Sequence, residues 1–166
     1  VILDGAHNPD KIRALIRWIK ETKENILRAS DSESRSLKGS SRPALPAGRQ
    51  ARTINSVILV LAFKKGKKWK KMIDLLVQNL PIEQVIATGF SAVTDTGKFS
   101  AVPVQVICDY LTSIVDSRST IVKKIENSQE ATVEAINAAK NGEIVLVCGS
   151  LYLVGEVRTM WNLPEF

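Results

Sequence analysis

The sequence has 166 residues, of which 45% are hydrophobic and 24% charged, a composition typical of one soluble globular domain with a hydrophobic core. No apolar run approaches the roughly 20 residues of a membrane-spanning helix, so we expect no membrane partner. The net charge of +6 raises nucleic acid as a partner, but only 5% of the residues are aromatic and the positive charge gathers in two short segments, which disfavours it.

The chain opens on a short apolar run, Val1–Leu3, which is followed by the polar sequence Asp-Gly-Ala-His-Asn-Pro at residues 4–9. This order predicts a buried strand, a turn and a helix. The helix is indicated by one apolar face at helical spacing, formed by Ile12, Leu15, Ile16 and Ile19. Asn8 suits the cap of this helix and Pro9 its first position, and the pattern fades near Asn25. Because the chain starts in mid-strand without an initiator methionine, we expect it to be a domain of a longer protein.

Residues 29–53 break the alternation of apolar and polar positions. The segment is rich in serine, glycine, proline and charged residues, and it offers no apolar face to bury. The sequence therefore predicts a disordered surface insertion at 29–53, with a basic docking or regulatory loop as the alternative.

The rest of the chain alternates strands and helices. Strands are predicted at 57–62, 84–88, 120–125 and 144–148, and helices begin near Trp69, at Pro103, at Ser128, which suits the cap position, and at Leu151. Residues 89–102 are predicted as a loop. The run at 57–62 is almost wholly apolar, which is typical of a strand covered on both faces. This alternation predicts an α/β, Rossmann-like three-layer sandwich around a mostly parallel sheet of about five to six strands, with one edge strand as the place for an exception.

The two cysteines, Cys108 and Cys148, lie singly in predicted apolar elements. Their isolation favours buried free thiols in a reducing, cytoplasmic environment, with a disulfide as the alternative.

Polar segments follow predicted strands at both ends of the chain. Ligands bind at the carboxyl ends of parallel strands, so Asp4 is placed to accept hydrogen bonds from the two hydroxyls of a ribose. His7, the only histidine, lies beside a helix N-terminus, which favours phosphate. Asn8 and Ser150 suit both helix capping and ligand contact. For all four residues a purely structural role in the turn is the alternative.

The lysine-rich segment 64–71 follows the predicted strand 57–62. Most of these lysines fit a solvated helix start, and Lys67 is the candidate for contact with a phosphate or a substrate carboxylate. The sequence has no zinc-like Cys/His spacing, phosphate-binding loop or dinucleotide fingerprint, and it predicts no metal site of its own.

The polar segment 4–9 and the sequence Gly-Ser-Leu-Tyr-Leu-Val-Gly-Glu-Val-Arg at 149–158 together resemble the C-terminal domain of folylpolyglutamate synthase/dihydrofolate synthase, in the Mur ligase superfamily. The resemblance covers the chain except 29–53. It implies a Mur ligase C-terminal-like domain at 1–166, with the N-terminal ATPase domain outside this chain. It also implies a reaction in which ATP converts a carboxylate of folate or dihydropteroate to an acyl phosphate, which the amine of L-glutamate attacks.

The resemblance implies roles for particular residues. Asp4 would hold the ribose, His7 would lie near the phosphates and Ser150 close to the nucleotide. The implied cofactor is ATP with Mg²⁺, the metal held mainly by the N-terminal ATPase domain, so the isolated chain would be inactive. The family often has Asp-Lys-Asp where Gly66-Lys67-Lys68 stand, so only Lys67 matches. The alternatives are the C-terminal domain of another Mur-type amino-acid ligase and a non-catalytic nucleotide-binding or interaction module.

Overall fold

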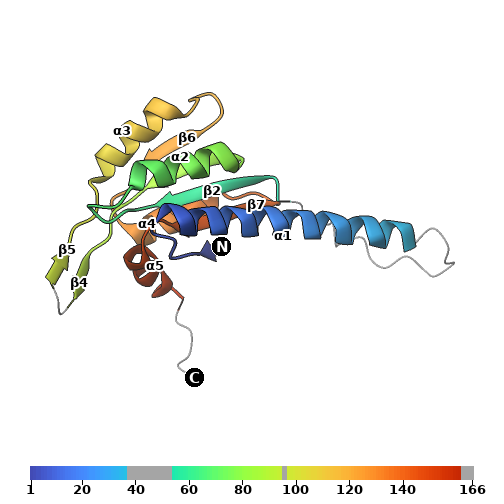
Figure 1. Ribbon diagram of the computed structural model, residues 1–166, viewed down its shortest axis with the longest axis horizontal. Coiled ribbons are helices and arrows are strands. Elements are labelled where there is room, and N and C mark those ends of the chain that lie inside the picture. Colours follow the sequence, from blue (N-terminus) through green and yellow to red (C-terminus); the bar gives the residue numbers. More distant parts are fainter. Residues whose placement is uncertain (37–53, 95–96, 162–166) are drawn as a thin grey trace, which may run out of the picture.

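The computed structural model describes residues 1–36, 54–94 and 97–161, which form a three-layer α/β structure around a five-stranded sheet (Figure 1). The strands follow one another across the sheet as β1 (Ile2–Leu3), β7 (Glu143–Cys148), β2 (Ser56–Leu61), β3 (Ile82–Ala87) and β6 (Ile121–Lys124). Every neighbouring pair in this sheet is parallel. The predicted fold class is therefore confirmed, and the described sheet has no antiparallel edge strand.

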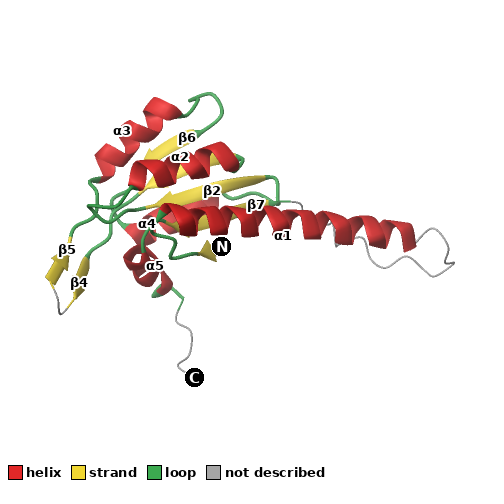
Figure 2. Cartoon of the chain, in the orientation of Figure 1, coloured by secondary structure: helices red, strands yellow, loops and turns green. Residues whose placement is uncertain are grey.

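The helices cover both faces of the sheet (Figure 2). One face packs against α1 (Pro9–Ser36), α2 (Trp69–Asn79) and α3 (Val104–Ile114), and the other against α4 (Ser128–Ala138) and α5 (Leu151–Arg158). Successive residues of β2 serve the two cores in turn, with Leu59 in the first and Val60 in the second, and both are fully buried. This arrangement accounts for the apolar run at 57–62. None of the described helices is long and apolar enough to cross a membrane.

Helix α1 begins as the sequence predicts but ends later. The Asn8 Oδ1 atom accepts a hydrogen bond from the Lys11 backbone N at 2.9 Å, and the helix starts at Pro9. It continues past Asn25 to Ser36 and projects beyond the sheet (Figure 1). In the described part of this extension, an ion pair one turn apart joins Glu24 and Arg28 and supports the helix. Residues 29–36 are thus helical, and 37–53 of the predicted insertion lie outside the described residues.

Two local predictions are corrected by the structure. The predicted loop 89–102 contains two short antiparallel strands, β4 (Ala92–Thr94) and β5 (Gly97–Phe99). Three-residue strands are too short to show a periodic pattern. The cap of α4 is Asn127 rather than Ser128, because the Asn127 Oδ1 atom accepts from the backbone N atoms of Gln129 and Glu130 at 2.9 and 3.0 Å.

Candidate functional site

The two polar segments singled out in the sequence meet at the carboxyl edge of the sheet. Strand β1 pairs with β7, and the pairing continues beyond the strand, where the Asp4 backbone N donates to the Val147 carbonyl at 3.0 Å. The Gly149 backbone N then donates to the Ala6 carbonyl at 3.1 Å. These bonds hold the β1–α1 turn, with Asp4, His7 and Asn8, directly beside the β7–α5 turn, with Ser150.

The Asp4 carboxylate is fixed by its own turn. Its Oδ1 atom accepts a hydrogen bond from the Ala6 backbone N at 2.7 Å, and the residue is half-buried. Its charge acts on the neighbouring strand, where burial and, to a smaller extent, the Asp4 carboxylate raise the pKa of the fully buried Cys148 thiol. Asp4 thus presents an oriented negative charge at this edge, and Cys148 stays neutral.

The His7 ring is oriented by a backbone carbonyl. Its Nδ1 atom lies 2.8 Å from the Gly5 carbonyl oxygen. Because a carbonyl can only accept a hydrogen bond, this geometry assigns the proton to Nδ1. The Nε2 atom is then the ring nitrogen that remains for a ligand.

The β7–α5 turn passes close to the end of β2. Gly149 has φ +104°, and a Cβ atom there would lie 2.6 Å from the Ala62 carbonyl oxygen, so the turn requires glycine. The next residue, Ser150, is 2% exposed, and its Oγ atom accepts from the Tyr152 backbone N at 3.2 Å. Ser150 is therefore the N-cap of α5, as the sequence predicts, and its side chain is largely enclosed.

An aromatic pair and a lysine lie beside this turn. Tyr152 and Lys64 belong to segments singled out in the sequence, without a role of their own, and Phe90 was missed. The Tyr152 ring stacks on Phe90, with centroids 5.6 Å apart, and the Lys64 Nζ atom lies 5.8 Å from the Tyr152 centroid. Lys64 is the first charged residue after the buried run at 57–62, which is the signal that could have found it. Phe90 has no such signal. The ends of β2, β3 and β7 thus converge here.

The candidate Lys67 lies in the β2–α2 turn at the same edge. Its backbone N donates to the Lys64 carbonyl at 3.4 Å, and its side chain is exposed. Among the described contacts, Lys64 rather than Lys67 reaches the β7–α5 turn.

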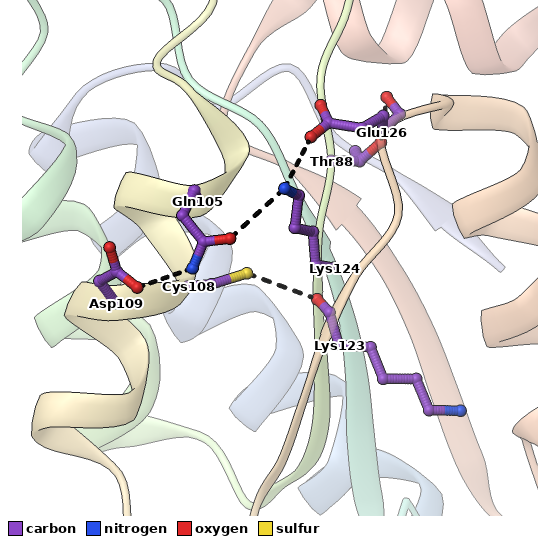
Figure 3. A network of polar contacts seen from close by, with 7 residues as sticks. All are labelled: Thr88, Gln105, Cys108, Asp109, Lys123, Lys124 and Glu126. Carbon is purple, nitrogen blue, oxygen red and sulfur yellow. Dashed lines mark hydrogen bonds and ion pairs between the residues drawn. The ribbon is translucent and has the colours of Figure 1, made fainter.

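A polar network holds the ends of β3 and β6 together (Figure 3). The Glu126 carbonyl accepts from the Thr88 hydroxyl at 3.2 Å and from the Gly89 backbone N at 3.1 Å. The Lys124 Nζ atom reaches the Glu126 carboxylate at 3.2 Å and the Gln105 side-chain oxygen at 3.3 Å. This network anchors the strand end that leads to Phe90. Within the described ranges, no three His, Cys, Asp or Glu side chains are grouped to hold a metal ion.

A pocket of about 460 Å³ opens beside the β1–α1 turn. Its lining comes from the turn, from one face of α1 and from the start of α5, and consists of Asp4, Gly5, Ala6, Lys11, Ala14, Leu15, Trp18 and Leu151. A second cavity, of about 600 Å³, is lined by Val1, Leu3, Val154, Arg158 and Trp161. Of the predicted site residues, only Asp4 lines either cavity.

Solved structures share this fold. They include E. coli FolC in complex with DHPP and ADP, with 17% identity and a TM-score of 0.58 over 95% of this chain and 27% of that chain. The bifunctional folylpolyglutamate synthase/dihydrofolate synthase of Yersinia pestis, complexed with AMPPNP and Mn, has 14% identity and a TM-score of 0.58 over 97% and 28% of the two chains. The Mycobacterium tuberculosis folylpolyglutamate synthase complexed with ADP and AMPPCP has 15% identity and a TM-score of 0.59 over 98% and 30%.

At these identities the likeness shows the fold alone, and this chain spans less than a third of the length of each of these structures. No curated protein matches the chain in sequence. The family model of the dihydrofolate synthetase C-terminal domain matches residues 44–160, which include the β7–α5 turn and most of the sheet. The resemblance seen in the sequence is thereby confirmed, and the chain belongs to the family of dihydrofolate synthetase C-terminal domains.

Proposed function

We propose that the chain is the nucleotide-closing C-terminal domain of an ATP-dependent ligase that adds L-glutamate to folate or dihydropteroate. The observation that carries the proposal is the hydrogen bond from the Gly149 N to the Ala6 carbonyl, at 3.1 Å, because it unites both sequence motifs at one sheet edge. Family membership supports the proposal. So do the ligands in the titles of similar structures, which name ADP with DHPP, and AMPPNP with Mn.

In this proposal Asp4 accepts hydrogen bonds from the ribose hydroxyls. Its Oδ1 bond to the Ala6 N orients the carboxylate before the ligand arrives, so little side-chain freedom remains to be lost on binding. His7 and Asn8 lie at the N-terminus of α1, where the helix dipole favours the phosphates. Ser150 acts by holding the first turn of α5. Lys67 remains a second candidate for a phosphate or substrate carboxylate.

The proposed chemistry has two steps. A carboxylate oxygen of the folate substrate attacks the terminal phosphorus of ATP, which gives an acyl phosphate and ADP. The amine of L-glutamate then attacks the acyl carbon, forms the amide and releases phosphate. We propose that an N-terminal ATPase domain of the same protein holds Mg²⁺ and the triphosphate, and that this chain closes over the nucleotide from the other side.

Substitution of Asp4 tests the proposal in a protein that includes the ATPase domain. We expect Asp4→Ala to raise the KM for ATP or lower kcat at least tenfold, while the loss of its turn hydrogen bond costs only about 1 kcal/mol of stability. The matched control is Asp10→Ala, because the Asp10 carboxylate lies nearby and is 89% exposed, and its ATP dependence should stay within twofold. A much lower melting temperature of Asp4→Ala with unchanged ATP dependence would show that Asp4 is structural.

A further inference from the structure

We propose that the lysine-rich segment 64–71 is an electrostatic docking surface for an acidic face of the ATPase domain. The inference rests on the proposed function, because it needs a second domain that closes over the carboxyl edge of the sheet. The segment forms the turn between β2 and α2 and the start of α2, at the same edge as the β1–α1 and β7–α5 turns. A domain that closes over those two turns therefore approaches the lysines as well.

The segment concentrates the positive charge of the chain. Its six lysines equal in number the whole net charge of +6. No acidic residue stands between Lys64 and Lys71, and the first turn of α2 holds none either. Among the described residues, no carboxylate forms an ion pair with Lys65, Lys68 or Lys71. The positive charge has no counter-charge within the segment, which suits a negative surface outside it.

The lysines also occupy a position that an α-helix disfavours. Lys68 is the N-cap residue of α2 and makes no side-chain capping hydrogen bond, and Lys70 and Lys71 lie in the first turn. The partial positive charge at a helix N-terminus favours carboxylates and disfavours ammonium groups. Residues that break a local rule of this kind, with no compensating contact in the fold, are expected where a function requires them.

The backbone of the segment is fixed to a neighbouring part of the chain. The Lys65 backbone N donates to the Ser100 carbonyl at 3.1 Å, and the Val102 backbone N donates to the Phe63 carbonyl at 2.7 Å. These bonds hold the turn before any partner arrives. The lysines are thus presented from an ordered base, which reduces the conformational entropy that docking has to overcome.

The form of this surface favours a protein over a small molecule or a nucleic acid. None of the six lysines lines either of the two cavities described above. The aromatic ring of the segment, Trp69, already contacts Tyr110 edge-on at a centroid distance of 5.4 Å, and the Lys70 Nζ atom lies 5.6 Å from the Trp69 centroid. It is therefore not an open platform for stacking a base. Lysines without a pocket or an open aromatic face suit the carboxylates of a protein surface.

Zero-length cross-linking tests the partner in a protein that includes the ATPase domain. A carbodiimide joins a lysine to a carboxylate only where the two groups are in contact. We expect bonds between lysines of segment 64–71 and Asp or Glu residues of the ATPase domain, more of them with AMPPNP and folate present than without, as identified by mass spectrometry. Lys20, which is exposed and contacts Asn79 at the opposite edge of the sheet, should form no bond to that domain.

Charge reversal tests whether these contacts support closure. Lys65→Glu combined with Lys68→Glu should lower kcat for glutamate addition about fivefold or more at about 50 mM salt, and the two proteins should become similar at about 500 mM, where salt screens the contacts. The melting temperature should not fall, because a carboxylate suits the N-terminus of α2. The matched control, Lys20→Glu combined with Arg118→Glu, makes the same change in charge at the opposite edge and should keep kcat within about twofold.

The outcomes separate this inference from the proposed function. If the longer protein adds glutamate, but the segment forms no bond to the ATPase domain and the double variant matches its control at low salt, the docking surface is wrong and the proposed function stands. If the longer protein adds no glutamate, the proposed function is wrong, and the cross-links, which need no activity, still decide the docking surface. A raised KM for the folate substrate, with unchanged kcat and no bond between the domains, would assign the lysines to the anionic substrate and overturn the inference.

Discussion

At the scale of single residues, Gly149 is the point where the two turns and the end of β2 meet. Its positive φ and the 2.6 Å approach to the Ala62 carbonyl leave no room for a side chain. We therefore expect Gly149→Ala to lower the free energy of unfolding by about 1–3 kcal/mol, measured by urea denaturation.

The matched control for this substitution is Gly155→Ala in α5, the helix that follows the same turn. Gly155 is exposed within α5, and nothing lies within 4 Å of an added Cβ atom. Alanine there should stabilise the helix by about 0.5–1 kcal/mol. Equal effects of the two substitutions would contradict the close packing of the turn.

The buried thiols give a prediction about pH. Burial raises the pKa of Cys108, and burial together with the Asp4 charge raises that of Cys148. Because the pKa of each thiol is higher in the folded than in the unfolded protein, the protonated thiols stabilise the fold fully below the unfolded pKa of about 8.5. This stabilisation is lost as the pH rises above that value. Both thiols should resist a thiol reagent in the folded protein near neutral pH and react after unfolding. Rapid reaction of the native protein would contradict the enclosure of Cys148.

Local chemistry explains which residue assignments could be made from sequence. Asn8, Pro9 and Ser150 are correctly placed because capping depends on neighbours within one turn. Phe90 could not be assigned to the site, because it meets Tyr152 only through the order of strands in the sheet. The ligand contacts of Asp4 and His7 stay predictions.

At the scale of elements, strong apolar periodicity locates the helices and strands, whereas their ends depend on weaker forces. The body of α1 could be predicted because the residues that pack on the sheet recur in the sequence at helical spacing. Its extension to Ser36 has no such periodic signal, and the short strands β4 and β5 have none either.

The start of α4 gives a sharp test, because sequence and structure assign its cap to adjacent residues. Asn127 accepts two backbone hydrogen bonds, whereas the buried Ser128 hydroxyl has no partner among the described residues. Asn127→Ala should cost about 1 kcal/mol of stability, and Ser128→Ala should be neutral or slightly stabilising, because it removes a buried unsatisfied group. Thermal unfolding of the two variants measures this difference. A lower melting temperature for Ser128→Ala than for Asn127→Ala would identify Ser128 as the cap.

At the scale of the whole molecule, the position of the last strand creates the candidate site. Strand β7 lies between β1 and β2, so the turns after the first and last strands become neighbours. Alternation of strands and helices predicts a parallel sheet, but it does not fix this order, which results from the α4 crossover on the opposite face from α1, α2 and α3. From sequence, the segments 4–9 and 149–158 could be assigned to one site only by their resemblance to a known family, because hydrophobic periodicity does not show which strands are neighbours.

The most direct test of the central claim is an assay of glutamate addition to dihydropteroate or folate. It is run on this chain alone, on a longer protein that includes the ATPase domain, and on that protein with Asp4→Ala. We predict no amide product from the chain alone, ATP-dependent product from the longer protein and strongly reduced product from the variant. Robust ligase activity of the chain alone would contradict the two-domain account. A longer protein with an intact phosphate-binding loop that adds no glutamate would contradict the assignment of this chain to a folate–glutamate ligase.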